Sequence, residues 1–290
     1  MRGLRYATHL GYRSTATPLF LPALGMLDPS AHIEMAAKLG FQGVQIPHAM
    51  SLSEVEVADA ESALASTGLE ASCLLCTPRD PRAAALWTQA EHDTKKQLDS
   101  FVLRACALAL RLRSKTLAAV PRVVEGEDLD RQRATLISNL RHATSMLDDH
   151  GVTLCIEPMR LLPDALLRSS SDAVAVVKAV DHPSVRMVFD TAHSWDMEGD
   201  VVAALSQCYE VTSLVQLADQ PGRVEPGAGR IDLVGVLRDL MLRGFEGIVG
   251  LENEWSLPGV DGMNTGLETF WKVDADARRA VESVRTSGNR

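Results

Sequence analysis

The chain has 290 residues and a mass of 31.4 kDa, enough to bury the core of one barrel-sized domain or of two small ones. Hydrophobic residues make up 46% and charged residues 23%, and the formal net charge of −9 argues against a nucleic-acid binder, which needs a basic face. No apolar run reaches the length of a membrane span and no signal peptide is apparent, so we expect a cytoplasmic protein with no membrane partner.

Short apolar segments alternate with longer helical patterns along the chain. A first strand near residues 6–10 precedes a helix at 29–39, which Asp28 caps and Gly40 ends. The pattern continues with predicted elements that are listed here in chain order: a strand at 43–46, a helix at 53–66, a strand at 69–76, one long helix at 83–112, a strand at 116–120 and a helix at 128–149.

The second half of the chain adds four more strand–helix units. The strands are predicted at 153–157, 185–190, 212–216 and 247–252, and a closing helix at 267–284. Eight such units in under 300 residues predict a single-domain α/β protein, a (β/α)₈ TIM barrel, over residues 1–285, with a frayed tail at 286–290. A doubly wound open sheet is the alternative, but it usually shows a G-x-G-x-x-G turn, which we do not find.

Cys73 and Cys76 form a C-x-x-C motif, which can bind zinc or carry redox chemistry. The motif lies inside the apolar run 71–76, which is typical of a strand, and no second pair has the spacing of a zinc finger. We therefore interpret both cysteines as buried small hydrophobic residues in a reducing cytoplasm.

The last four predicted strands each end in a side chain that carries an oxygen. These residues are Glu157, Asp190, Gln216 and Glu252, at separations of 33, 26 and 36 residues. An average barrel unit has about 30 residues, so the four side chains should converge above the strand ends. One such residue can simply meet solvent or cap a helix, but three gathered carboxylates repel one another unless a cation or protons intervene. The oxygens predict a divalent metal ion, Mg²⁺ or Mn²⁺ before Co²⁺ or Zn²⁺.

Two further residues are candidates for substrate binding. His193 follows Asp190 by three residues, a spacing that returns its imidazole to the barrel mouth, although a loop histidine can also cap a helix. Arg223 lies in the Gly- and Pro-rich loop 219–229 and could bind an anionic or polyhydroxylated substrate. The alternative for this loop is an ordinary surface turn with a solvated arginine.

Five segments of the chain resemble the xylose-isomerase-like superfamily of sugar isomerases and epimerases. They are residues 156–158, 189–193, 216–223, 225–232 and 250–252. Residues 215–226 follow the V-Q-[IL]-A-x-x-P-G-R-x-E-P segment of the hydroxypyruvate isomerase branch, to which the resemblance is closest. The resemblance is specific over about residues 150–255, and before them only the order of strands and helices is similar.

The resemblance implies a function for each candidate residue. Glu157 and Glu252 would be both metal ligands and the acid/base pair, and His193 and Arg223 would contact substrate. The two further metal ligands would be Asp190 and Gln216. Such a site would isomerise a small α-hydroxycarbonyl compound, hydroxypyruvate or a related keto acid or ketose, through an enediolate.

Some positions depart from the relatives. Ketohexose 3-epimerases have a histidine in place of Gln216 and a glutamate in place of Pro163, so ketohexose epimerisation is less expected. Many relatives have an asparagine after the Glu-Pro segment, where this chain has Met159 and Arg160. Arg160 suggests a substrate with a carboxylate. His48 and Arg122 could assist it from neighbouring strand ends, although a structural role suits both. A ketose 3-epimerase and a keto-acid dehydratase of the dehydroshikimate dehydratase kind stay open as alternatives.

Two other classes of protein are weighed against an isomerase. An AP endonuclease of the same superfamily would need several histidine ligands, but only His193 of the 8 histidines lies in a ligand-like motif. A non-enzymatic sugar-binding barrel would be expected to lack one acid/base glutamate, and both are present. We expect a small-molecule substrate as the partner and leave a homo-oligomer open.

Overall fold

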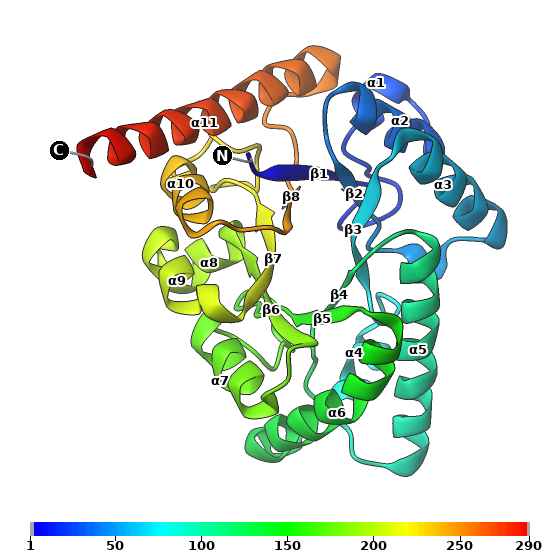
Figure 1. Ribbon diagram of the computed structural model, residues 1–290. Helices are drawn as coiled ribbons and strands as arrows, with labels where there is room; N and C mark the ends of the chain where they lie inside the picture. The colour runs from blue at the N-terminus through cyan, green and yellow to red at the C-terminus, as the bar shows by residue number, and fades with distance from the viewer. Residues whose placement is uncertain (1–2, 289–290) are drawn as a thin grey trace.

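Eight parallel strands close into a barrel in the computed structural model, which describes residues 3–288 (Figure 1). Strands that are consecutive in the chain are neighbours in the barrel, and β8 pairs with β1 to close it. The predicted TIM barrel is therefore confirmed and the open sheet is excluded. The strands are β1 (Arg5–His9), β2 (Gly43–Gln45), β3 (Glu70–Leu75), β4 (Thr116–Ala119), β5 (Thr153–Ile156), β6 (Val185–Asp190), β7 (Thr212–Leu217) and β8 (Ile248–Leu251).

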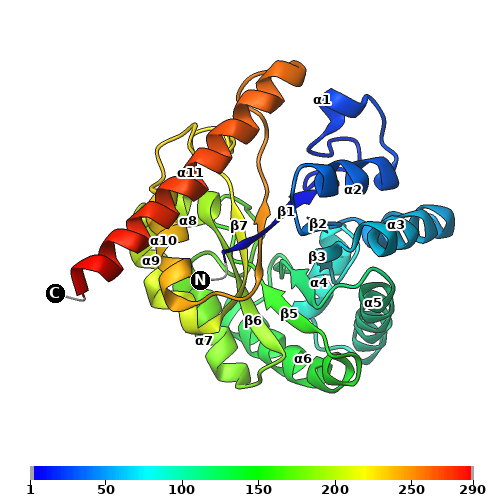
Figure 2. The same ribbon diagram turned by 45° about the horizontal axis from the view of Figure 1, so that its top comes forward.

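Helices surround the barrel wall (Figure 2). The α-helices are α1 (Leu21–Leu24), α2 (Pro29–Lys38), α3 (Glu54–Thr67), α4 (Pro81–Ala85), α5 (His92–Arg111), α6 (Leu129–His150), α7 (Ser170–Val180), α8 (Thr191–Glu198), α9 (Val201–Cys208), α10 (Leu233–Arg243) and α11 (Gly259–Gly288). The 3₁₀ helices are η1 (Ala49–Ser51), η2 (Leu86–Thr88) and η3 (Tyr209–Val211). Across residues 3–288, no helix has both the length and the apolarity that crossing a bilayer requires.

Short polar side chains begin several helices where the sequence predicts. Asp28 accepts a hydrogen bond from the Ser30 N–H at the start of α2, and Asp128 caps α6. Ser53 and Glu56 form a reciprocal capping box at the start of α3. Each cap satisfies backbone N–H groups that have no partner inside the helix, so these boundaries can be read from the sequence.

The single long helix predicted at 83–112 is wrong, because the chain forms α4, η2 and α5 there. The backbone is extended at Gln89, and the Asn139 amide on α6 donates to the carbonyls of Trp87 and Gln89 at 3.0 and 3.1 Å. In a continuous helix those carbonyls would accept from backbone N–H groups of the next turn. Asn139, about 50 positions away in the chain, satisfies them instead and so stabilises the break. The closing helix is also longer than predicted, because α11 runs from Gly259 to Gly288. It therefore includes residues 286–288 of the segment that was expected to fray. Residues 289–290 of that segment lie outside the described part.

The apolar core has two parts. A large cluster lies between the barrel and its helices, and a small one joins side chains from five successive strands, which can meet only inside the barrel. Cys73 belongs to the inner cluster and Cys76 to the outer one, so the two thiols point to opposite faces of β3. Both are buried and free, which confirms their interpretation as buried hydrophobic residues. The inner cluster provides an apolar floor below the barrel mouth.

Candidate active site

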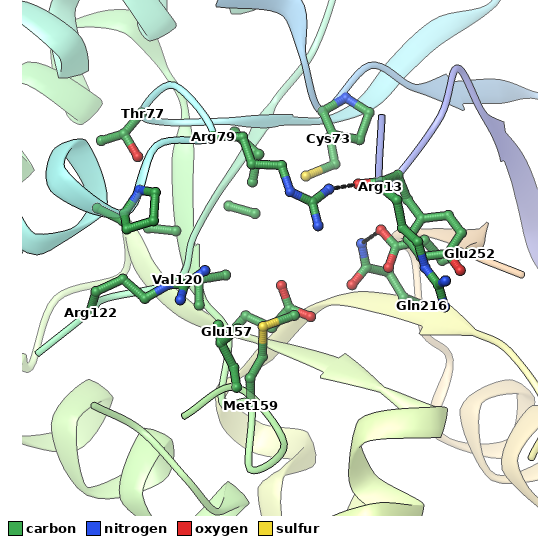
Figure 3. A pocket seen from close by; sticks show the side chains of 18 of the residues that line it. Arg13, Cys73, Thr77, Arg79, Val120, Arg122, Glu157, Met159, Gln216 and Glu252 are labelled. Carbon is green, nitrogen blue, oxygen red and sulfur yellow. Dashed lines mark hydrogen bonds between the residues drawn. The ribbon is translucent and has the colours of Figure 1, made fainter. Parts of the chain in front are cut away.

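A pocket of about 290 Å³ opens above the C-terminal ends of the strands (Figure 3). Seven of the candidate residues singled out in the sequence line it, namely Cys73, Arg122, Glu157, His193, Gln216, Arg223 and Glu252. Asp190 lies directly behind them, bonded to Arg223. This is the end of the barrel where enzymes of this architecture hold their active sites.

The strand ends position the four oxygen-bearing residues, which we call the strand-end cluster: Glu157, Asp190, Gln216 and Glu252. Parallel pairing aligns Asp190 of β6 with Gln216 of β7, and Gln216 with Gly250, two residues before Glu252. All four residues are buried, with exposed fractions of 3–7%. The structure thus brings together the groups that the regular spacing predicts to converge.

Arg223 joins two members of the strand-end cluster. Its Nη2 donates to Asp190 Oδ2 at 2.6 Å and to Glu252 Oε2 at 2.5 Å, and its guanidinium lies 4.8 Å from the centre of the Tyr12 ring. Burial alone would raise the pKa of Asp190, but the charge of Arg223 and the hydrogen bond from the His193 backbone N–H lower it below its usual value. Arg223 is therefore a fixed counter-ion inside the pocket.

The loop that carries Arg223 is held by buried carboxylates. Asp219 accepts hydrogen bonds from the N–H groups of Gly227, Gly229 and Ile231, at 2.9–3.0 Å. Glu225 accepts from the Ser256 N–H at 2.7 Å, which ties the loop to the segment after β8. These bonds turn the loop inward, so Arg223 is only 7% exposed and the surface-turn alternative does not apply.

The two glutamates that face the pocket have raised pKa values. Burial, together with the charges of Glu252 and Asp190, raises the pKa of Glu157 well above its usual range. Burial raises the pKa of Glu252 to about 7, although Arg223 opposes the shift. A carboxyl group whose pKa lies near neutrality can both give and take a proton at cellular pH, which suits acid/base catalysis.

A chain of hydrogen bonds orients the amide of Gln216. Gln45 of β2 donates from Nε2 to the Leu251 carbonyl at 3.0 Å, so its Oε1 faces Gln216 and accepts from Gln216 Nε2 at 2.8 Å. Gln216 Nε2 also donates to Glu252 Oε1 at 2.6 Å. A Cβ at Gly250 would lie 2.6 Å from Gln45 Nε2, so only glycine leaves room for this contact. The Oε1 of Gln216 is left buried without a partner.

The donor set fits a divalent cation. Glu157, Asp190 and His193 each offer a ligand atom, and these atoms lie within 4.8 Å of one another. Glu157 Oε1, like Gln216 Oε1, is buried without a hydrogen-bond partner. When ionised, the three carboxylates outweigh the single Arg223 charge, and a dication would balance the difference. Oxygen and imidazole donors do not by themselves identify the metal.

His193 lies in the first turn of α8. Its backbone N–H donates to Asp190 Oδ1 at 2.9 Å, so Asp190 caps the helix, and its Nε2 lies 3.7 Å from Glu157 Oε1. Burial lowers the pKa of His193, which favours the neutral imidazole. The side chain is thus placed to contact either substrate or metal, while its assignment to substrate stays a prediction.

Arg160 and His48 do not join the pocket, which corrects their expected placement. Arg160 is exposed and donates to the Met197 carbonyl at 3.2 Å, because the loop after β5 turns outward and Arg168 bonds its carbonyl. His48 begins η1 and lines a separate small cavity together with His32. Arg122 does line the main pocket, where it pairs with Asp164.

Sequence reasoning missed several residues of the pocket. Tyr12 and Arg13 come from the loop after β1, and Arg79 from the segment after β3. Gln45, which ends β2, does not line the pocket but bonds Gln216, and no sequence motif identifies it. Each of these residues follows or ends a correctly predicted strand. Its position at the C-terminal end of that strand was therefore the signal that could have placed it near the active site.

Comparison with known proteins places these features in a family. Residues 33–273 match the model of the family described as xylose isomerase-like TIM barrel. The hydroxypyruvate isomerase of Escherichia coli K12 is 27% identical over 231 residues, which cover 79% of this chain and 88% of that protein. The 2-oxo-tetronate isomerase of Haemophilus influenzae is 27% identical over 248 residues, covering 82% and 91%. Among solved structures, an AP endonuclease, family 2, from Brucella melitensis has a TM-score of 0.76 at 25% identity, covering 93% of this chain and 98% of that one.

Proposed function

The chain belongs to the xylose isomerase-like TIM-barrel family, and we propose that it is a divalent-metal-dependent isomerase of a small α-hydroxy keto acid such as hydroxypyruvate. The observation that carries this proposal is the pair of buried glutamates, Glu157 and Glu252, which follow strands β5 and β8 and line one small pocket at the barrel mouth. Two relatives with high coverage are named isomerases, and both act by name on oxo or hydroxy acids. The resemblance seen in the sequence points the same way.

The residues that would hold the metal are those of the strand-end cluster, and His193 has a ligand atom within 4.8 Å of those of Glu157 and Asp190. A bound divalent cation would polarise the oxygens of an α-hydroxycarbonyl compound, which makes the intervening C–H group more acidic. Arg223 would keep Asp190 and Glu252 in place while the substrate exchanges protons with the pocket.

The two glutamates would move one proton between adjacent carbons. One carboxylate takes the proton from the hydroxyl-bearing carbon, which gives an enediolate, and a carboxyl group returns a proton to the former carbonyl carbon. The hydroxyl proton passes to the former carbonyl oxygen, so the compound is rearranged without net gain or loss of atoms. The apolar floor that includes Cys73 and Ala118 limits water at the reacting carbons.

A substrate panel in D₂O tests this proposal. The enzyme loaded with Mn²⁺ is incubated with small keto acids and ketoses, and the products are examined by NMR for carbon-bound deuterium. An isomerase moves the carbonyl and incorporates deuterium at the former carbonyl carbon. An epimerase incorporates deuterium without moving the carbonyl, and a dehydratase releases an unsaturated acid. No exchange and no product with any member of the panel would overturn the proposal.

A further inference from the structure

The wall of the pocket that faces the strand-end cluster is lined by cationic side chains. Arg79 follows β3 and Arg122 follows β4, and these strands are neighbours in the barrel. Figure 3 shows the Arg79 side chain reaching into the pocket, with Glu157 on the facing wall. The space between them is bounded by apolar groups, among them Leu75 and Met159. The carboxylates of the pocket therefore lie at one end, and Arg79 and Arg122 lie at the other.

Arg79 differs from the other arginines of the pocket because it lacks an acidic partner. Arg223 pairs with two carboxylates, Arg122 pairs with Asp164, and Arg13 lies 3.9 Å from Glu254. Within residues 3–288, no carboxylate lies within 4.0 Å of the Arg79 guanidinium, whose hydrogen bond goes to the Tyr12 carbonyl. A guanidinium has five N–H donors, so most of the Arg79 donors are available to a ligand.

Arg122 adds a second cationic group to the same pocket wall. Its backbone N–H donates to the Ala84 carbonyl on α4 at 3.4 Å, and Thr88 donates from Oγ1 to its carbonyl at 2.8 Å. These bonds hold the segment after β4 against the segment that carries Arg79. The Arg122 side chain is 18% exposed, and its Nε is buried without a hydrogen-bond partner.

The positive end of the pocket faces the glutamates without pairing with them. Since Arg79 lies beyond ion-pair distance of either, an anion held at this end would be kept apart from the carboxylates of the strand-end cluster.

We propose that Arg79, on the pocket wall that also carries Arg122, binds the carboxylate of the substrate and selects keto acids over neutral ketoses. A planar guanidinium can bind a carboxylate through two parallel hydrogen bonds, which fixes orientation as well as charge. With its carboxylate on Arg79, a short keto acid directs its hydroxycarbonyl carbons toward Glu157 and Glu252. Selection among substrates rests on the proposed isomerase function, whereas anion binding at Arg79 does not.

A matched pair of substrates tests the selection. Hydroxypyruvate has a carboxylate at one end, where 1,3-dihydroxyacetone has a neutral hydroxymethyl group, and the two are otherwise the same. Arg79→Leu should lower kcat/KM for hydroxypyruvate about 10- to 100-fold, mainly through KM, which is the scale of a lost charge-assisted contact. Turnover of 1,3-dihydroxyacetone should stay within about twofold. Arg82→Leu, an exposed arginine on α4 outside the pocket, is the control and should change neither value.

A binding measurement separates this proposal from the isomerase assignment. Pyruvate and the neutral hydroxyacetone are titrated into chelator-treated protein and followed by ligand-observed NMR. The wild type and Arg82→Leu should bind pyruvate in preference to hydroxyacetone, and Arg79→Leu should lose that preference. If no substrate is turned over but pyruvate binding depends on Arg79, the isomerase function fails and the anion site stands. If the wild type shows no preference for pyruvate, or Arg79→Leu keeps it, the anion site is overturned.

Discussion

Strands β5–β8 and strands β1–β4 contribute opposite kinds of side chain to the same pocket. The β5–β8 half supplies the buried strand-end cluster, whose carboxylates outnumber the single Arg223 guanidinium. The β1–β4 half supplies Arg79 and Arg122 together with apolar groups, and its cations lie nearer the solvent. A pocket with two unlike ends can bind a substrate in one orientation, with the reacting carbons at the acidic end and the anionic group of the substrate at the other end.

The largest expected effect comes from removing the metal that the acidic half requires. A chelator should abolish turnover, because the buried carboxylates then lack a balancing charge and the substrate oxygens are not polarised. Mg²⁺, Mn²⁺ or Co²⁺ should restore it in a steady-state assay. Full activity in a sample shown to be metal-free by elemental analysis would contradict the assignment of the strand-end cluster.

The next effect concerns the two glutamates of the acidic half. Glu157→Gln and Glu252→Gln should each lower kcat by at least ~10², the typical scale for losing a positioned acid or base. Each glutamine keeps an oxygen donor, so affinity for Mn²⁺, measured by calorimetry, should fall less than activity. Near-normal turnover in both variants would show that other groups move the proton.

The two halves also differ in how far the sequence predicts them. Glu157 and Asp190 are predictable because a carboxylate at the end of a buried strand is costly against the apolar helix layer and is accommodated at the barrel mouth. The direction of a loop beyond a strand end depends on distant partners. Arg160 points outward because Arg168 holds its segment, and Arg223 points inward because Asp219 holds its loop. Arg79 belongs to no motif, so only the folded chain shows it in the pocket.

A stability measurement probes the counter-ion of the acidic half. In chelator-treated protein, Arg223→Leu leaves Asp190 and Glu252 buried without their partner, which should lower the free energy of unfolding by about 3–5 kcal/mol. Urea unfolding followed by circular dichroism gives the value. Added Mn²⁺ should recover part of the loss, because a cation would balance the same charges.

Arg279→Leu is the control for that measurement, since the Arg279 side chain is 65% exposed and pairs with Asp276 on the surface of α11. Removing an exposed pair should change the free energy of unfolding by less than about 1 kcal/mol. Equal stabilities of the Arg223 and Arg279 variants would mean that the buried carboxylates do not need Arg223.

The smallest expected effect tests Gln45, a residue of the β1–β4 half that contacts the acidic half. Gln45 does not belong to the proposed ligand set, but its Oε1 accepts from Gln216 Nε2 and so leaves Gln216 Oε1 facing the site. Gln45→Leu removes this constraint and should weaken Mn²⁺ binding about 10-fold, as loss of a group that orients a ligand typically does. Gln216→Leu removes the donor itself and should weaken binding further. If Gln45→Leu binds Mn²⁺ as tightly as the wild type while Gln216→Leu does not, Gln216 needs no orienting partner, and the two halves act independently. If Gln216→Leu also binds normally, Gln216 is not a ligand and the acidic half consists of three carboxylates and His193.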